Sequence, residues 1–389
     1  MKITHEKACH CALNRIFGFE PKISLALISH LGSASEIFAL SPKEVDGILG
    51  PHSKYRGTIS AEALDEAYRE LETLSTRDIT FVGWNEEEYP KSLKECEDAP
   101  AGLYIKSSCQ SGIAWNKRRM ISIIGTRDLS PYGKEWCERI VMSLSEIAEK
   151  DRPIIVSGLA FGVDICAHTA ALKNGLPTIA VMATGPESVY PGRHRGFAQD
   201  IYHASGSALI TDYPPGTAPL AIHFLRRNRI IAGLSEATIL VESKIKGGGM
   251  MTARLADSYN RTVFALPGRV DDIRSQGCNN LIRNRIATPI SSIEEFLRDL
   301  GVKRSVKGTQ HDCCARIEEI YRGALPEDKI SQMGTILLAI RKERGIAAED
   351  ISFQTGIDYT RVSQLLGMLE TDGIISRDLL QRCFINFQK

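Results

Sequence analysis

Six short runs of β-branched and aliphatic residues, each followed by a glycine-bearing or polar loop, constrain this chain more than any other feature. The runs cover residues 120–124, 153–157, 178–182, 208–211, 237–241 and 262–266. Strands that are apolar throughout are typical of a parallel sheet covered by helices on both faces. The stretches 133–149, 164–174 and 250–260 supply helices to connect them. We therefore predict an extended Rossmann-like α/β fold, doubly wound around a mainly parallel sheet.

The sequence changes character on either side of this region. The first part has apolar blocks broken by Gly32, and Ser41 stands three residues before Glu44 in a capping box that starts a helix. The last part has the spacing of a helix-turn-helix followed by two short strands. Gly308, Gly323 and Pro326 suggest a linker with a short helix. We predict a helical domain of helix-hairpin-helix or SAM-like type at 1–78, the Rossmann-like domain at 79–300, a linker at 301–328 and a winged-helix domain at 329–389.

Charge and composition narrow the function classes. The net charge is +1 and charged residues make up 24% of the chain, so any site for a polyanion must be a local concentration of Lys and Arg. The sequence has no CxxC pair and no metal-spaced His/Cys cluster, so we expect no metal and no cofactor. It has no signal peptide and no apolar run of about 18 residues. We expect a cytoplasmic protein with reduced thiols and no membrane association.

The loops after the apolar runs carry the chemistry, because an open parallel sheet binds ligands beyond the carboxyl ends of its strands. Glycine lets a backbone approach an anion, arginine can donate two hydrogen bonds to one phosphate, and helix N-termini attract negative charge. Aromatic side chains near them can stack on bases. The candidate nucleic-acid-binding residues are Gly125, Thr126, Arg127, Ser157, Gly158, Gly162, Arg193, Arg195, Phe197, Arg226, Asn228, Arg229, Lys244, Lys246, Gly247, Gly248 and Asn279.

Two groups of residues in or near these loops rest on specific interpretations. Arg226, Arg227, Asn228 and Arg229 stand together before an apolar run, and we expect them at the edge of the sheet, facing a negative group. We expect His168 to be a buried histidine packed against the sheet. Each loop taken alone is also compatible with an ordinary turn, but five such loops together are far more specific. No catalytic motif accompanies them, so they predict phosphate binding without cleavage.

With these motifs the sequence resembles a known family, DNA-processing protein A (DprA/Smf). The members of this family are bacterial recombination mediators. The resemblance is carried in order by IIGTR at 123–127, VSGLAFGVDICAH at 156–168, YPGRHRGF at 190–197, PPGTAP at 214–219, NRIIAGLS at 228–235, VESKIKGGGMMTA at 241–253, LPG at 266–268 and SQGCNNLI at 275–282. The chain departs from the family at His194, where asparagine is usual, and at the triple glycine 247–249.

The resemblance implies several properties. It implies a Rossmann-like domain that binds single-stranded DNA without sequence preference, and it implies no enzymatic activity. It also implies a homodimer that loads RecA onto DNA coated with single-strand-binding protein during natural transformation. The dimer surface is not evident from the residues: Ile290, Ile293, Phe296 and Leu297 fit either a dimer face or an ordinary core.

Two other functions stay open. A nucleotide-processing enzyme of phosphoribohydrolase type has a similar glycine-rich loop, and Glu242 would be its candidate catalytic acid. Alternatively, the winged helix could read duplex DNA as a transcription factor. However, residues 325–389 hold eight Lys or Arg against nine Asp or Glu, and the expected recognition helix carries only Arg361. This balance favours contact with a protein over contact with duplex DNA.

Overall fold

The computed structural model describes residues 3–108, 115–302, 317, 320–343 and 345–385. The chain divides into two compact units, Met1–Arg304 and Ser305–Lys389, each described here by itself. Gly308 of the predicted linker lies outside the described residues. No helix in the described part of the chain has the length and apolar character needed to span a membrane.

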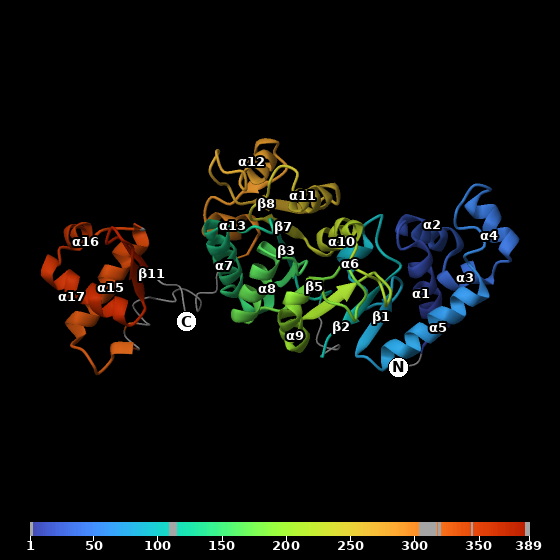
Figure 1. The fold of residues 1–389 in the computed structure, drawn as a ribbon, viewed down its shortest axis with the longest axis horizontal. Helices are drawn as coiled ribbons and strands as arrows, with labels where there is room; N and C mark the ends of the chain where they lie inside the picture. Colours follow the sequence, from blue (N-terminus) through green and yellow to red (C-terminus); the bar gives the residue numbers. More distant parts are fainter. Residues whose placement is uncertain (1–2, 109–114, 303–316, 318–319, 344, 386–389) are drawn as a thin grey trace. The chain divides into compact units, whose positions relative to one another are not determined.

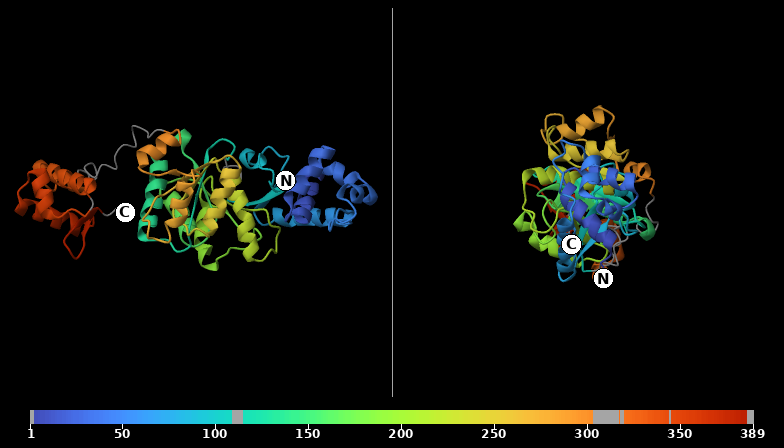
Figure 2. Two further views of the ribbon diagram at one scale, coloured as in Figure 1. Left: turned by 90° about the horizontal axis from the view of Figure 1, so that it is seen from above. Right: turned by 90° about the vertical axis from the view of Figure 1, so that its right-hand side faces the viewer.

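The first unit opens with five helices at the β1 end of the sheet (Figures 1 and 2), and the first and fifth of them pack against strand β1. Their bounds are α1 (His5–Phe17), α2 (Pro21–Leu31), α3 (Ala34–Ala39), α4 (Pro42–Leu49) and α5 (Ala61–Ser75). The predicted capping box is present at α4, where Ser41 and Glu44 satisfy each other's backbone N–H groups. Helices and sheet therefore form one compact unit, with β1 starting four residues after α5 ends.

A single large sheet forms the centre of this unit, and it confirms the predicted fold class. In the described residues it has nine strands in the order β1-β2-β6-β5-β4-β3-β7-β8-β9. Neighbours from β6 to β9 are parallel, whereas β1 and β2 are antiparallel additions at one edge. The strands are β1 (Ile79–Gly83), β2 (Gly102–Lys106), β3 (Met120–Ile124), β4 (Ile154–Ser157), β5 (Thr178–Val181), β6 (Ala208–Thr211), β7 (Ala237–Leu240), β8 (Thr262–Ala265) and β9 (Thr288–Pro289).

All six predicted strands are present, and alternate residues of each face opposite sides of the sheet. On one side, Ala180 of β5 and Leu209 of β6 belong to a separate small core. In β3, Met120 and Ile124 contribute to the core beneath α10 (Ala221–Leu234) and α11 (Gly248–Ser258). Ile121 and Ile123 contribute to the opposite core, beneath α7 (Pro131–Ser145), α8 (Val163–Lys173) and α13 (Ile293–Asp299). Burial on both faces explains why these strands are apolar throughout. The remaining short helices of the unit are α6 (Lys91–Lys94), η2 (Glu149–Asp151), η3 (Gly192–His194), α9 (Arg195–His203) and α12 (Gln276–Arg283).

The four residues considered for a dimer face belong to this second core. Ile290, Ile293, Phe296 and Leu297 are all buried around α13, and the Phe296 ring packs edge-on against Phe264 of β8. Within this chain they are therefore ordinary core residues. A dimer surface must use other side chains.

The described part of the second unit includes three helices followed by a two-stranded antiparallel hairpin. The elements are α15 (Glu327–Lys342), α16 (Ala348–Thr355), α17 (Tyr359–Thr371), β10 (Ile375–Arg377) and β11 (Cys383–Ile385). Buried side chains from all three helices and both strands form a core of its own. The helices and the hairpin follow the order predicted for a winged-helix domain, with α17 directly before the hairpin.

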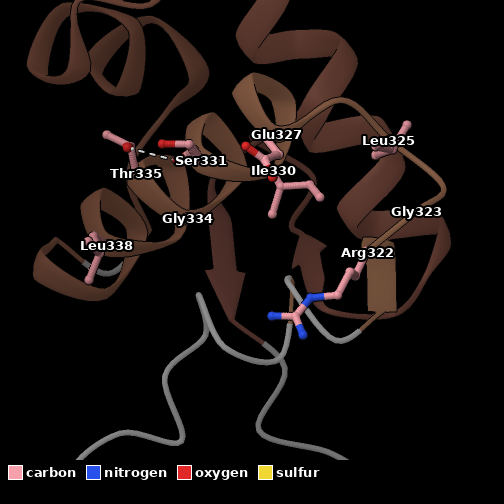
Figure 3. Close-up of a pocket in the computed structure, with 9 residues that line it drawn as sticks. All are labelled: Arg322, Gly323, Leu325, Glu327, Ile330, Ser331, Gly334, Thr335 and Leu338. Atoms are coloured by element: carbon pink, nitrogen blue, oxygen red, sulfur yellow. Dashed lines mark hydrogen bonds between the residues drawn. The ribbon is translucent and has the colours of Figure 1, made fainter.

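A cavity of about 610 Å³ lies along the first half of α15 (Figure 3). It is lined by Arg322, Gly323, Leu325, Glu327, Ile330, Ser331, Gly334, Thr335 and Leu338. The Thr335 hydroxyl donates to the backbone carbonyl of Ser331 at 3.0 Å, so it is turned onto its own helix. We assign this cavity no ligand.

Candidate nucleic-acid interface

The strand order places a crevice next to β3. The chain runs outward from β3 through β4, β5 and β6 on one side, and through β7, β8 and β9 on the other. In open α/β sheets, ligands bind outside the carboxyl ends of the strands where the order reverses. The loops after β3, β4 and β7 therefore meet at this point.

The loops after β3 and β7 are in direct contact, and glycine makes this possible. The Thr126 N–H donates to the carbonyl of Glu242 at 2.7 Å. A Cβ on Gly125 would lie 2.5 Å from a Val163 methyl and 2.7 Å from the Glu242 carbonyl oxygen, and one on Gly249 would lie 3.2 Å from the Cα of Gly125. No larger residue fits at Gly125 without moving the backbone.

The loop after β4 packs onto the same place. Gly162 has a φ of +76°, and a Cβ there would lie 2.2 Å from the carbonyl oxygen of Thr126. The Val163 N–H donates to that carbonyl at 3.1 Å. The Asp164 carboxylate accepts from the Ala160 N–H at 3.3 Å and so braces the loop from within. The three loops thus form one rigid backbone surface at the crevice.

Two helices that begin at this edge, α8 and α11, have no side-chain cap. Their N-cap residues are Gly162 and Gly247, and neither can supply a side-chain acceptor. Away from these loops, α1, α5 and α13 are each capped by a Ser or Thr hydroxyl. Uncapped N–H groups and the positive end of the helix dipole favour an anion. Gly248 faces open space, so nothing in the described residues blocks access to the start of α11.

Five cations around the crevice are exposed and form no ion pair with any described residue: Arg127, Arg193, Arg195, Lys244 and Lys246. They come from the loops after β3, β5 and β7. By contrast, Arg15 is paired with Glu70 at 2.6 Å, and Arg274 is paired with Asp128 at 2.9 Å. Unneutralised charge of one sign at one edge creates a positive local potential that a net charge of +1 conceals. We call these five residues the rim cations.

Exposed aromatic rings lie among the rim cations. Phe161, Tyr190 and Phe197 are exposed. The Phe161 and Phe197 rings pack edge-on against His194, with centroids 4.6 and 5.9 Å away. Tyr190 packs on Phe224 at 5.4 Å, and the Arg127 guanidinium lies 5.5 Å from the centre of that Phe224 ring. Rings next to cations are the combination that binds bases and phosphates of a single strand.

His194 is buried behind these aromatic rings and fixes the loop that carries Phe161. It is buried, and its Nδ1 donates to the Leu159 carbonyl at 2.8 Å, which ties η3 to the loop after β4. Its substitution for the asparagine usual in the family therefore bears on the position of the loop. Phe161 and Phe224 were not among the predicted residues, although an exposed aromatic in a glycine loop was a signal available at Phe161.

We expected Arg226, Arg227, Asn228 and Arg229 at the edge of the sheet, facing a negative group. All four lie in α10, and this prediction was wrong for the last three. Arg227, Asn228 and Arg229 are buried in the second half of α10, between the sheet and its neighbours. Arg229 forms an ion pair with buried Asp212 and donates to the Asp98 carbonyl at 2.5 Å. An arginine can be buried when acceptors meet its guanidinium, and both of these acceptors come from distant parts of the chain.

Arg226 also binds within the protein. Its guanidinium donates to the Gly18 carbonyl at 2.6 Å and lies 4.4 Å from the centre of the Phe19 ring. It joins the N-terminal helices to α10.

Arg227 gives Gly158 a role that the sequence did not predict. Its guanidinium donates to the carbonyls of Gly158, at 2.7 Å, and of Val181. A Cβ on Gly158 would lie 2.1 Å from a guanidinium nitrogen of Arg227. Gly158 is therefore required by a buried arginine rather than by close approach of an anion. Burial lowers the pKa of Arg227, while the nearby Asp164 acts in the opposite direction.

His168 is buried beside the same group, which confirms the prediction. Its Nδ1 lies 2.7 Å from the Thr178 hydroxyl, which itself donates to the Ile155 carbonyl, so His168 is the donor of this pair. Burial, together with the charges of Arg227 and His194, lowers the pKa of His168 to about 3. His168 is neutral in the folded chain at ordinary pH.

Two other predicted residues are occupied inside the fold. The Ser157 hydroxyl is buried and donates to the Ile123 carbonyl at 2.6 Å. The Asn279 side chain donates to the Gly268 carbonyl at 3.0 Å and accepts from the Gly268 N–H at 3.3 Å. The structure therefore brings together the rim cations, Gly125, Thr126, Gly162, Gly247, Gly248 and Phe197. The remaining predicted residues are buried or bonded within the fold: Ser157, Gly158, Arg226, Asn228, Arg229 and Asn279.

Glu242, the candidate acid of the enzyme hypothesis, is also engaged. It is buried, and its carboxylate accepts from the N–H of Ser130 at 3.0 Å and from the Ser130 hydroxyl. The carboxylate thus sits at the N-terminus of α7, where negative charge is stabilised. Among the described residues no group of three or more His, Cys, Asp or Glu could hold a metal ion.

Comparison with known proteins agrees with this geometry. The sequence matches the family described as DNA recombination-mediator protein A over residues 80–301. It is 32% identical to protein Smf of Synechocystis over 96% of this chain and 97% of that protein. It is 36% identical to DNA processing protein DprA of Bacillus subtilis over 63% of this chain and 76% of that protein.

Solved structures agree as well. The X-ray structure of DNA processing protein A from Streptococcus pneumoniae superposes with a TM-score of 0.62 at 28% identity, covering 77% of this chain and 98% of that one. A structure of DNA processing protein A from Helicobacter pylori, described for its single-stranded DNA binding mode, gives a TM-score of 0.50 at 30% identity over 57% of this chain and 95% of that one. The chain belongs to the DNA recombination-mediator protein A family.

Proposed function

We propose that this chain binds single-stranded DNA at the carboxyl edge of its sheet and acts as a non-enzymatic mediator of recombination. The observation that carries the proposal is the set of rim cations, all exposed and without an acidic partner among the described residues. Two uncapped helix N-termini lie at the same edge. The relative from Helicobacter pylori, whose single-stranded DNA binding mode is described, supports the same ligand here.

The distribution of charge favours a polymer over a small nucleotide. The rim cations come from three different loops, whereas one nucleotide pocket would need them around a single phosphate. Phe161, Tyr190 and Phe197 are exposed between them and can stack on bases. Base faces are free only when the strands are separated, so the aromatic rings select a single strand over a duplex. Binding through phosphates and stacking carries little sequence preference.

The partners follow from the family rather than from the geometry. We propose that the chain forms a homodimer and delivers the bound strand to a RecA-type recombinase, displacing single-strand-binding protein, during DNA uptake. The name of the family, recombination mediator, supports this role. We propose no catalytic step, since Glu242 is held by Ser130 at the start of α7.

The proposal is tested by titrating an oligonucleotide at several salt concentrations. Arg127→Ala should weaken binding by about 1–3 kcal/mol, the range for hydrogen bonds to charged groups. Each lost phosphate contact should also reduce the slope of log K against log salt by about 0.7. Arg298→Ala serves as the matched control, because Arg298 is exposed and paired with Glu295 at 3.6 Å. If the double variant Arg127→Ala/Lys244→Ala binds as tightly as the parent at physiological salt, the site is wrong.

Two further measurements separate the other functions. Competition between duplex and single-stranded DNA of one sequence should favour the single strand; a strong duplex preference would support the transcription-factor alternative. Incubation with nucleoside monophosphates should release no free base, and sustained turnover would support the phosphoribohydrolase alternative.

A further inference from the structure

The first turn of α10 exposes an apolar strip that the rim cations do not use. Leu220, Ile222 and Leu225 are 55, 49 and 42% exposed, and Phe19, which follows α1, is 51% exposed. Single exposed apolar residues are ordinary, but a contiguous group marks a binding surface. α10 begins after the loop that follows β6, so its first turn lies at the carboxyl edge of the sheet.

The strip is continuous with the rim. Phe224 in the first turn contacts both Tyr190 and Arg127. Successive side chains of an α-helix are about 100° apart, so Leu225 comes next around the helix, followed by Ile222 and Arg226. The Arg226 guanidinium in turn lies against Phe19. A path of exposed and half-buried side chains therefore runs from Arg127 across the start of α10 to Phe19.

The Phe19 ring is held by neighbouring side chains, while about half of its surface remains exposed to solvent. The Arg226 guanidinium covers one side of the ring at 4.4 Å and is itself fixed by its hydrogen bond to the Gly18 carbonyl. The His223 ring lies 5.7 Å away, and its Nδ1 donates to the Ala218 carbonyl at 3.0 Å. A ring positioned in advance loses little conformational freedom when a ligand stacks on it.

The chemistry of the path suits bases more than phosphates. Its exposed side chains are apolar or aromatic, and the guanidinium of Arg226 is already engaged by Gly18. The N-terminus of α10 has no side-chain cap and lies between the rim and the strip, so a phosphate can be placed there. Phosphates would thus be held at the rim and at the start of α10, with the bases turned onto the strip.

We propose that Phe19 is a base-stacking residue, and that a single strand leaving the rim cations crosses the first turn of α10 and ends on the N-terminal helices. This inference rests on the proposed function, and it adds a binding site in the region before the sheet. A strand long enough to reach Phe19 binds more tightly than a strand that occupies only the crevice.

The test compares two oligothymidylates, of about 5 and about 20 nucleotides, which bracket the site sizes of single-strand binders. Phe19→Ala should raise the Kd for the long strand roughly tenfold, as expected for loss of one base–aromatic stack, and leave the short strand unaffected. Phe353→Ala is the matched control, because Phe353 is 89% exposed on α16 of the second unit. Thermal unfolding confirms that each variant is folded.

Phe19→Trp gives a direct readout of stacking. This variant should retain the affinity for the long strand, and its additional fluorescence, above that of Trp84, Trp115 and Trp136, should be quenched when the long strand binds. Unchanged binding by Phe19→Ala, or unchanged fluorescence of Phe19→Trp in the bound state, overturns the inference and leaves the strip to a protein partner.

Arg127→Ala separates this failure from that of the proposed function. If Arg127→Ala weakens both oligonucleotides while Phe19→Ala weakens neither, only the stacking inference fails. If Arg127→Ala also binds both as tightly as the parent, the site at the carboxyl edge fails with it.

Discussion

Two arginine-bearing segments of this chain are similar in sequence and opposite in structure. Arg193 and Arg195 lie in η3 and at the start of α9, where both are exposed and have no acidic partner among the described residues. Arg227 and Arg229 lie in the second half of α10 and are buried with acceptors for their guanidinium groups. A cluster of positive residues therefore indicates a binding surface only when the element that carries it ends at the surface.

The second unit carries arginines of a third kind, which lie near the surface but are paired with acidic residues. Arg361 of the expected recognition helix is bound to Gln332 at 2.9 Å and to Asp328 at 3.3 Å, and Arg377 is paired with Glu370. These side chains are partly exposed but already neutralised. These two arginines of the second unit are therefore held by acidic partners, unlike the rim cations.

The largest expected effect is a loss of stability when one of the buried α10 arginines is replaced. Arg229→Ala removes the partner of buried Asp212, and loss of one member of a buried ion pair costs about 3–5 kcal/mol of unfolding free energy. Urea unfolding followed by tryptophan fluorescence measures this, because all three tryptophans lie in the first unit. Arg193→Ala should leave stability unchanged. A stable Arg229→Ala variant that has lost DNA affinity would break the comparison.

We also expect the stability of the chain to fall in acid, because His168 is buried next to Arg227. The pKa of His168 is about 3 in the folded chain against 6.5 ordinarily, so between these values only the unfolded chain binds the proton. Stability should be complete above about pH 6.5 and fall by about 1.4 kcal/mol per pH unit as the pH decreases toward 3. His168→Asn keeps an N–H donor for Thr178 and should remove this contribution. Equal slopes of unfolding free energy against pH for parent and variant would contradict the assignment.

We expect a smaller effect, on DNA affinity, when a rim cation is replaced. Arg195→Ala should weaken single-stranded DNA binding by about 1–2 kcal/mol, because one charge-assisted contact is lost. Its unfolding free energy should stay within about 0.5 kcal/mol of the parent, since Arg195 is exposed and forms no ion pair among the described residues. Fluorescence anisotropy and urea unfolding, run on the same preparation, measure the two quantities. A loss of stability with unchanged affinity would place Arg195 with the α10 arginines.

The smallest effect is expected in the second unit. Arg361→Ala should change neither the affinity for single-stranded DNA nor, beyond about 0.5 kcal/mol, the unfolding free energy. Arg361 is already paired with Asp328 at the surface. Anisotropy with single-stranded and duplex oligonucleotides provides the measurement, and a loss specific to the duplex would show that the winged helix reads DNA.

Much of the fold could be predicted from the sequence because its signals are local. A strand buried on both faces must be apolar at every position, and this pattern located all six central strands. β1 and β2 were missed because Tyr104, Lys106 and Thr80 interrupt that pattern in an antiparallel edge. Gly125 and Gly162 were singled out because glycine lets the backbone approach an anion, and the structure adds that close contact between the loops excludes a larger residue at both positions.

The sequence by itself determined the parallel sheet, the positions of its loops and the family. Only the tertiary structure decided which arginines reach solvent, because the acceptors of Arg227 and Arg229 come from Gly158, Val181, Asp98 and Asp212. It also decided that Gly158 accommodates a guanidinium, and that Phe19 lies against Arg226 of α10. Local periodicity describes the face of an element, whereas burial and pairing depend on residues far away in the chain.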